Sequence, residues 1–260
     1  MSPAAPTALV TGASAGLGRE FARQLALRGH DLVLVARRRD RLDDLAEELR
    51  QATGSEVTVI VQDLAEPAAA ATLHSTVTEL GIRIDLLINN AGIGTTGDLL
   101  ETDPDRLDQL VSLNITTLTG LSRRFGADMV TVGRGTILNI ASLAAVMPTP
   151  HMAVYGASKA YVLNVTLALE AELWGSGVRA IPVLPSATRT EFAASGGKVP
   201  GPEQLHADPT VVVGQILAAL DRKKPPLMIV PGRGNALMAP ILARLPRRLG
   251  LTLLKRVMRF

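Results

Sequence analysis

Short runs rich in Val, Ile and Leu alternate with longer runs of helical pattern along most of the 260-residue chain. The short runs are almost continuously apolar, which is typical of strands buried on both faces of a parallel sheet. Strands that alternate with helices build such a sheet through right-handed crossovers. The pattern therefore predicts an α/β fold with a doubly wound, seven-stranded parallel sheet flanked by helices. The expected strands are 7–11, 31–36, 57–63, 84–92, 136–142, 178–186 and 226–232, and the expected helices are 16–28, 40–51, 68–80, 104–132 and 154–174.

The length and composition of the chain fit one globular unit. With 47% hydrophobic and 20% charged residues, the chain can bury one large core and is not disordered. We expect a single domain over 1–260, with its core over about 7–231. Residues 1–10 have no basic segment ahead of an apolar one, and no apolar run reaches the roughly 18 residues of a membrane span. We therefore expect a cytoplasmic protein.

Two features of the composition exclude classes of function. Aromatic residues make up 3% of the chain, which is too few for the stacking platforms that bind single-stranded nucleic acid. The chain has no cysteine, which excludes disulfides, thiolate metal sites and cysteine nucleophiles. We expect neither a nucleic-acid partner nor a bound metal.

Basic residues gather at the C-terminal end. The net charge is +3, but residues 233–260 hold seven Lys and Arg and no Asp or Glu, so the rest of the chain has 20 basic and 24 acidic residues. Segments 236–245 and 248–260 show apolar residues at helical spacing, which predicts a cationic amphipathic extension over 233–260. Three interpretations stay open. The extension packs on the body as a lid or subunit interface, it makes weak peripheral contact with an anionic membrane or presents a hydrophobic substrate, or it is a solvated terminus.

A glycine-rich turn, TGASAGLG, follows the first expected strand and opens the first helix. Gly12, Gly16 and Gly18 permit a tight turn and let a pyrophosphate approach the N–H groups at the start of that helix. Their spacing is G-x-x-x-G-x-G rather than the commoner G-x-G-x-x-G. A turn without a ligand is the alternative, but the position after the first strand of a βαβ unit favours a dinucleotide site that includes Ser14 and Leu17.

The end of the second expected strand indicates which dinucleotide is preferred. A carboxylate at this point would accept hydrogen bonds from the ribose 2′-hydroxyl of NAD and repel a 2′-phosphate. The chain has Ala36 there, followed by Arg37, Arg38 and Arg39. Guanidinium groups bind phosphate well, so NADP(H) is predicted, with Arg37 the strongest candidate and Arg38 second. A solvated basic start to the next helix is the alternative for at least one of the three.

Polar residues also end the third and fourth expected strands. Asp63 has two interpretations of equal weight, an acceptor for the adenine amino group and an N-cap for the next helix. It is placed in the cofactor site together with Leu64. In the sequence NNAG, Asn side chains can tie neighbouring loops together and Gly92 lets a cofactor approach, so Asn90, Ala91 and Gly92 are predicted to line the same site.

Tyr155 and Lys159 lie four residues apart in an expected helix, with Ser142 thirteen residues upstream of Tyr155. Residues i and i+4 share a helix face, so the phenol and the ammonium project to the same place. A free tyrosine, with a pKa of about 10, is a poor acid–base group at neutral pH, and a neighbouring ammonium lowers that pKa by stabilising the phenolate. Asn114 lies inside another expected helix, where Asn has little intrinsic preference and can mark a kink that frees a carbonyl for water. An exposed helix pair is the alternative for Tyr155 and Lys159.

Taken together these motifs resemble the short-chain dehydrogenase/reductase family, whose fold is Rossmann-like. TGASAGLG, NNAG, Asn114, Ser142, Tyr155-x-x-x-Lys159 and a following proline loop occur in the family's order over about 7–231. The resemblance implies that Tyr155 is the general acid or base and that Ser142 orients the substrate oxygen. It implies that Lys159 lowers the Tyr155 pKa and binds the nicotinamide ribose, that Asn114 holds a relay water, and that Tyr155 and Lys159 also contact the cofactor.

One departure from the family pattern lies after the sixth expected strand. The family has Pro-Gly there, whereas this chain has Pro185-Ser186. A side chain at Ser186 can alter the loop backbone or narrow the site. Pro185, Thr188 and Thr190 are still predicted to contact the nicotinamide end of the cofactor, within an irregular loop over about 188–208 that covers the site.

The resemblance implies an NADP-dependent oxidoreductase that interconverts a ketone or aldehyde and an alcohol. The apolar tail favours a hydrophobic substrate of fatty acyl, steroid or polyketide type, and the family implies a homodimer or homotetramer. Two alternatives stay open: a non-catalytic dinucleotide sensor on the same fold, and an interaction protein that acts at a membrane surface through its tail.

Overall fold

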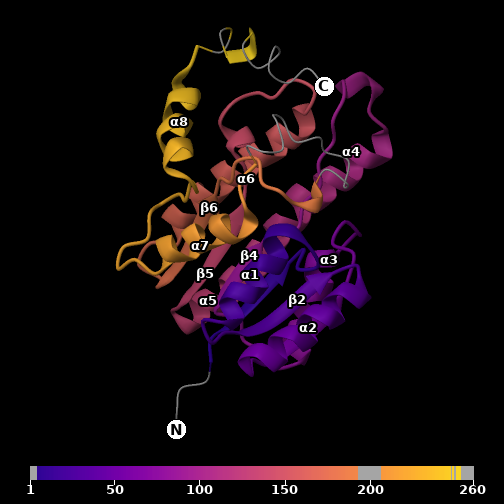
Figure 1. The fold of residues 1–260 in the computed structure, drawn as a ribbon, viewed down its shortest axis with the longest axis vertical. Coiled ribbons are helices and arrows are strands. Elements are labelled where there is room, and N and C mark those ends of the chain that lie inside the picture. The colour runs from indigo at the N-terminus through magenta and orange to yellow at the C-terminus, as the bar shows by residue number, and fades with distance from the viewer. Residues whose placement is uncertain (1–4, 193–205, 247, 249, 253–260) are drawn as a thin grey trace.

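The structure is a computed structural model that describes residues 5–192, 206–246, 248 and 250–252. At its centre lies a six-stranded parallel sheet with the strand order β3-β2-β1-β4-β5-β6. Figure 1 shows this sheet between layers of helices, which confirms the predicted doubly wound, Rossmann-like α/β fold. The strands are β1 (Thr7–Thr11), β2 (Asp31–Ala36), β3 (Val57–Val61), β4 (Leu86–Asn89), β5 (Gly135–Ile140) and β6 (Val178–Val183).

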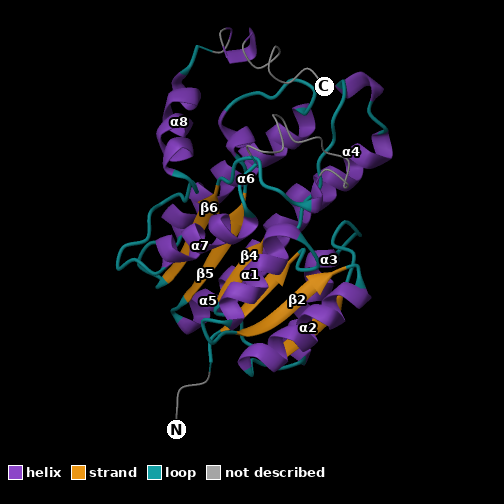
Figure 2. Ribbon diagram, viewed as in Figure 1, coloured by secondary structure: helices purple, strands orange, loops and turns teal. Residues whose placement is uncertain are grey.

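Helices cover both faces of the sheet, because successive strand residues point to opposite sides. On one face Ala8 and Val10 pack with α1 (Gly16–Ala26), α2 (Arg39–Thr53) and α7 (Pro209–Leu220). On the other face Leu9 packs with α3 (Ala69–Glu79) and α5 (Leu118–Val132), and the C-terminal end of α6 (Ala153–Glu172) joins them through Leu169. Figure 2 shows the same layers coloured by secondary structure. Burial of each strand on both faces explains the continuous apolar runs.

The predicted seventh strand is wrong. Residues 226–232 contribute one parallel bridge, Val183 to Ile229, in which Ile229 N donates to Pro182 O at 3.0 Å and Leu184 N donates to Ile229 O at 2.8 Å. Prolines at 225, 226 and 231 flank this bridge. Proline has no N–H to donate, so the ladder cannot extend.

The expected helix over 104–132 is interrupted. It consists of α4 (Pro104–Val111), a π-turn η2 (Ser112–Thr117) and α5. Asp103 caps the start of α4 by accepting from Asp105 N at 3.1 Å, with Pro104 at the first helical position. The π-turn contains Asn114, which is the residue at which the sequence suggests a kink in the helix. The described part of the chain also contains the short 3₁₀ turns η1 (Leu99–Glu101) and η3 (Leu143–Val146).

The C-terminal segment begins with α8 (Arg233–Arg244), which contacts η3. Leu237, Met238 and Ile241 are exposed on α8, whereas Ala239 is buried. Gly250 lies next to Met147, since a Cβ on this glycine would be 2.7 Å from the Met147 Cε. Residues 249 and 253–260 of the second predicted segment, 248–260, lie outside the described residues, as does residue 247. Within the described part of the chain, no helix is both long enough and apolar enough to cross a membrane.

Candidate active site

The glycine turn and the NNAG segment meet at the carboxyl edge of the sheet between β1 and β4. The strand order reverses at this point, which is where open α/β sheets bind ligands. Asn90 Nδ2 donates to Thr11 O at 2.9 Å, and Thr11 Oγ1 accepts from the backbone N–H groups of Asn90 and Ala91. These bonds confirm that the asparagine ties the two loops together. Gly18 is required for the same packing, because a Cβ there would lie 2.2 Å from Gly12 O.

The start of α1 is suited to bind an anion. Its N-cap residue, Ala15, has no side-chain hydrogen bond to the first turn, and that turn contains no acidic residue. The first N–H groups and the positive end of the helix dipole are therefore available to a pyrophosphate. Thr190 lies over this turn, since a Cβ on Gly16 would be 3.0 Å from its Cβ. The residues present thus fit the phosphates of a dinucleotide.

Arg37 and Arg38, which follow β2, contact different parts of the site. Arg37 extends to Asp63, with 3.5 Å between Nη1 and Oδ2, and its side chain is 67% exposed. Arg38 instead contacts the glycine turn, where its Nε and Nη2 donate to Ser14 Oγ at 3.3 and 3.1 Å. The structure therefore places Arg38, the second candidate for the 2′-phosphate, beside the turn, and pairs Arg37, the first candidate, with Asp63.

Asp63 does not cap the next helix, so that alternative is wrong. α3 begins at Ala69 with Ala68 as its N-cap, whereas Asp63 Oδ1 accepts from Ala65 N at 2.9 Å. The Asp63 carboxylate thus closes a local turn and pairs with Arg37. Leu64, also predicted for the cofactor site, is buried, and its carbonyl accepts from Thr117 Oγ1 at 2.8 Å.

Tyr155 and Lys159 lie on one face of α6, and both are buried. Lys159 Nζ lies 5.8 Å from the Tyr155 ring centroid and donates to Ile140 O at 2.8 Å. Ser142, which follows β5, lies close enough to Tyr155 for its hydroxyl to lower the pKa of the phenol. The structure therefore brings together the three residues that the sequence places on two separate segments.

Burial controls the acidity of both groups. It raises the pKa of Tyr155 to about 12, while the hydrogen bond with Ser142 acts in the opposite direction. Burial also lowers the pKa of Lys159 to about 8. Lys159 is not among the causes of the Tyr155 pKa shift, so the expected lowering of that pKa by Lys159 is not found, and the phenol is protonated at neutral pH.

Asn114 connects the π-turn to the end of β4. Its Oδ1 accepts from Ile93 N at 3.0 Å, and its Nδ2 donates to Ile93 O at 2.9 Å. A Cβ on Gly92 would lie 3.2 Å from Asn114 Oδ1 and 3.4 Å from Lys159 Nζ. Asn114, Gly92 and Lys159 therefore gather at one point of the site.

The loop after β6 begins beside Ser142, because Leu143 N donates to Pro185 O at 3.0 Å. Thr188 is buried, and its Oγ1 donates to Ser186 O at 2.9 Å. Ser186 does not adopt the left-handed backbone conformation that would require glycine, since Ala68 and His151 are the non-glycine residues with positive φ in the described chain. The departure from Pro-Gly thus causes no backbone strain at this position.

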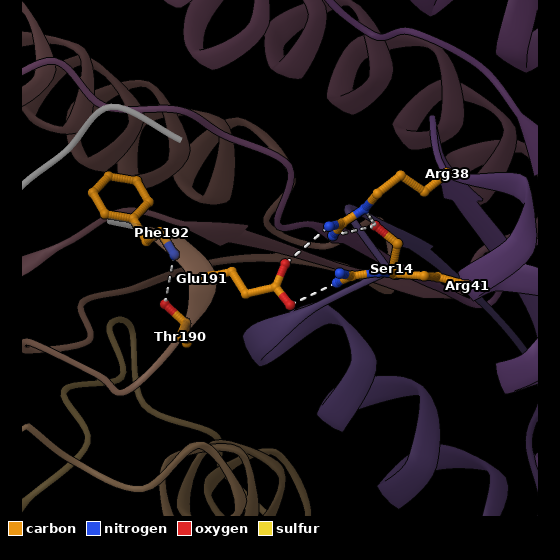
Figure 3. Close-up of polar contacts among 6 residues, drawn as sticks. All are labelled: Ser14, Arg38, Arg41, Thr190, Glu191 and Phe192. Atoms are coloured by element: carbon orange, nitrogen blue, oxygen red, sulfur yellow. Dashed lines mark hydrogen bonds and ion pairs between the residues drawn. The ribbon is translucent and has the colours of Figure 1, made fainter. Parts of the chain in front are cut away.

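Three residues of the site were not found from the sequence, namely Arg41, Glu191 and Phe192. Phe192 packs on Tyr155. Glu191 pairs with Arg38 and Arg41, as Figure 3 shows. Arg41 could have been recognised, because it lies three residues after Arg38 at the start of a helix. Glu191 and Phe192 had no periodicity to reveal them, since they lie in an irregular loop.

Comparison with known proteins identifies the family. The sequence model of the short chain dehydrogenases matches residues 6–198. The chain belongs to the short-chain dehydrogenase/reductase family. As a member, it is a nucleotide-binding oxidoreductase that acts on alcohol or carbonyl groups.

Individual relatives agree with this assignment. Sulfoacetaldehyde reductase 2 of Chromohalobacter salexigens is 35% identical over 217 residues, which cover 82% of this chain and 85% of that protein. A short-chain dehydrogenase from Sphingobium yanoikuyae in complex with NADPH is 39% identical, with a TM-score of 0.84 and 95% coverage of both chains. The bulky-bulky ketone specific alcohol dehydrogenase from Comamonas testosteroni is 36% identical, with a TM-score of 0.80 and coverage of 96% of this chain and 94% of that one.

Proposed function

We propose that the protein is an NADP(H)-dependent oxidoreductase that interconverts a hydrophobic ketone or aldehyde and the corresponding alcohol, with Tyr155 as general acid and base. The observation that carries the proposal is the buried pairing of Tyr155 with Ser142 and Lys159 at the carboxyl edge of the sheet. The glycine turn at the same edge fits a dinucleotide. A bound nicotinamide dinucleotide supplies or accepts the hydride.

Tyr155 transfers the proton. When the carbonyl carbon is reduced, negative charge develops on the substrate oxygen, and the Tyr155 hydroxyl donates its proton to that oxygen. A phenol with a pKa of about 12 stays protonated at neutral pH and is a far stronger acid than an alcohol, so the transfer is downhill. In the direction of oxidation the Tyr155 phenol must first lose its proton, and burial opposes that loss.

Ser142 and Lys159 support this transfer. The Ser142 hydroxyl orients the substrate oxygen next to Tyr155, and its hydrogen bond favours the phenolate. Lys159 in its ammonium form stabilises the phenolate left after transfer, because the two side chains share a face of α6. Asn114 holds the water that links Lys159 to solvent. The π-turn at Asn114 and its closeness to Gly92 and Lys159 support this role.

The preference for NADP(H) rests on the residues after β2. Ala36 provides no carboxylate for a ribose 2′-hydroxyl, and Arg38 lies against Ser14 of the glycine turn. A guanidinium in this position favours a 2′-phosphate. Pro185, Thr188 and Thr190 hold the nicotinamide end, and the NADPH bound to the 39% identical Sphingobium yanoikuyae protein is consistent with this preference.

The hydrophobic substrate class rests on the apolar surroundings of Tyr155. Ile93, Leu110, Met152 and Tyr155 form one buried cluster, with Phe192 packed against it. The Comamonas testosteroni relative is described as specific for bulky-bulky ketones, which points the same way. The Chromohalobacter salexigens relative is named for a small anionic aldehyde, so that substrate is the necessary comparison.

The test is NADPH oxidation with purified protein against aldehydes and ketones of graded chain length, bulky ketones and sulfoacetaldehyde. We expect kcat/KM to rise with chain length, by up to about fourfold for each added methylene that becomes buried. Higher activity with sulfoacetaldehyde than with every apolar substrate would overturn the substrate class. Absence of NADPH binding to cofactor-free protein would overturn the proposed function as a whole.

A further inference from the structure

Two arginines and a serine form a compact anion site beside the glycine turn, and a carboxylate of the chain itself occupies it. Glu191 Oε2 accepts from Arg38 Nη1 at 2.9 Å, and Glu191 Oε1 accepts from Arg41 Nη1 at 2.6 Å. The same Arg38 guanidinium donates to Ser14 Oγ. Figure 3 shows Glu191 reaching from its loop to the two arginines, with Ser14 against Arg38. We call Arg38, Arg41 and Ser14 the arginine clamp.

The arginine clamp has the chemistry of a phosphate monoester site. Two guanidinium groups and a hydroxyl provide several donors and two positive charges for one small anion. The clamp lies where β2 leads into α2, the place at which this type of fold distinguishes the 2′-hydroxyl from the 2′-phosphate of the adenosine ribose. The clamp is therefore suited to the phosphate that separates NADP(H) from NAD(H).

Glu191 satisfies the donors that such a phosphate would need. Each of its carboxylate oxygens is bound to one arginine, and these two hydrogen bonds are the main cause of its lowered pKa, so Glu191 is ionised at neutral pH. A second anion cannot share the clamp without repulsion from Glu191. A 2′-phosphate must therefore displace the Glu191 carboxylate, whereas a ribose 2′-hydroxyl need not.

We propose that Glu191 competes with the 2′-phosphate for the arginine clamp and so lowers the preference of this enzyme for NADP(H) over NAD(H). The inference rests on the proposed function and adds a residue that determines cofactor specificity from outside the usual binding turn. Glu191 lies between Thr190, which covers the glycine turn, and Phe192, which covers Tyr155. Displacement of the carboxylate by a phosphate therefore also frees the segment that joins the cofactor site to the catalytic tyrosine.

The test compares Glu191→Gln with the wild-type enzyme by measuring Kd for NADPH and NADH on cofactor-free full-length protein. The Gln side chain keeps the size of Glu but loses the charge. We expect Glu191→Gln to bind NADPH about three- to tenfold more tightly and to bind NADH within about twofold of the wild type. Glu191→Asp, which keeps the charge, is expected to stay closer to the wild type.

The chain offers a matched control in Glu48. This carboxylate also bridges two arginines on the surface, Arg19 at 3.4 Å and Arg23 at 2.8 Å, but it joins α1 to α2 away from the arginine clamp. Glu48→Gln is expected to leave both dissociation constants unchanged. Equal tightening of NADPH and NADH by Glu191→Gln would contradict competition, because it would mean that Glu191 acts on loop position alone.

Adenosine 2′-monophosphate separates failure of this inference from failure of the proposed function. We expect Glu191→Gln to bind this nucleotide more tightly than wild type and to bind adenosine 5′-monophosphate no differently. No change for NADPH and for the 2′-nucleotide overturns the inference while leaving the enzyme's function intact. If neither dinucleotide binds the wild type, the proposed function fails. The binding of adenosine 2′-monophosphate to the wild type and to Glu191→Gln then decides by itself whether Glu191 occupies an anion site.

Discussion

The Tyr155 ring packs against the Phe192 ring, with centroids 5.3 Å apart and planes inclined by 53°. Tyr155 belongs to α6, whereas Phe192 belongs to the loop that follows β6. The contact therefore joins the proposed proton donor to a segment that also carries Thr190 and Glu191. Exclusion of water by this contact contributes to the burial that raises the pKa of Tyr155 to about 12.

Phe192→Ala is expected to lower kcat/KM more for large apolar substrates than for small ones. The aromatic pair contributes about 0.5–1.5 kcal/mol beyond the area it buries, and its loss opens the apolar cluster around Tyr155 to water. We expect kcat/KM to fall about tenfold for a long-chain aldehyde and less for acetaldehyde. Phe192→Leu keeps an apolar cover and serves as the control. An equal loss for both substrates would show that Phe192 does not line the substrate site.

The pH dependence of reduction is expected to follow Lys159 rather than Tyr155. Burial lowers the pKa of Lys159 to about 8, so the ammonium that stabilises the phenolate is lost as the pH rises through that value. Tyr155, with a pKa of about 12, stays protonated over the same range. We therefore expect kcat/KM for reduction to be flat below neutral pH and to fall at higher pH, with one apparent ionisation near the value for Lys159.

The control for this profile is Lys159→Arg. An arginine keeps its charge throughout the measured range, so the decline is expected to move out of that range even if the absolute rate is lower. A decline that stays at the same pH in Lys159→Arg would assign it to another group. Oxidation of the alcohol is expected to show the opposite trend and to accelerate with pH, because Tyr155 must then act as a base in its phenolate form.

Gly18→Ala is expected to disrupt the glycine turn. The added Cβ would lie 2.2 Å from Gly12 O and 2.6 Å from Asn90 Nδ2, and the first of these atoms is backbone that cannot move freely. We expect a loss of about 1–3 kcal/mol in the free energy of unfolding together with weaker dinucleotide binding. Gly234→Ala in α8 is the control, because a Cβ there meets no atom within 4 Å. Unchanged stability and binding in Gly18→Ala would contradict the close packing described for this turn.

The sequence predicts much of this fold because its strands are buried on both faces. Continuous apolar runs locate β1 to β6, and the glycine turn identifies β1 as the first strand along the chain. The expected seventh strand is inferred from the apolar content of residues 226–232. It does not form because the prolines around Ile229 have no N–H group to donate, so the hydrogen-bond ladder stops at one bridge. Apolar periodicity likewise does not distinguish an α-helix from a helix that contains a π-turn, and Asn114 was the one signal of that interruption.

The site was predicted less evenly than the fold. Ser142, Tyr155 and Lys159 could be named because their chemistry and spacing are distinctive, and the structure brings them together. The sequence ranks Arg37 ahead of Arg38 for the 2′-phosphate, whereas in the structure it is Arg38 that donates to Ser14. Which of the two side chains turns toward Ser14 depends on tertiary contacts that the local sequence does not encode. Glu191 and Phe192 act through contacts with residues far away in the chain, which no local pattern encodes.

The most direct test of the central claim is single-turnover oxidation of NADPH by Tyr155→Phe, compared with the wild type, using the best apolar carbonyl substrate. The variant keeps the ring that packs on Phe192 but loses the hydroxyl. We expect NADPH to bind with its affinity changed by less than about threefold and the reduction step to slow by about 10²–10⁴-fold. A reduction step in Tyr155→Phe that proceeds at the wild-type rate would contradict the assignment of Tyr155 as the proton donor.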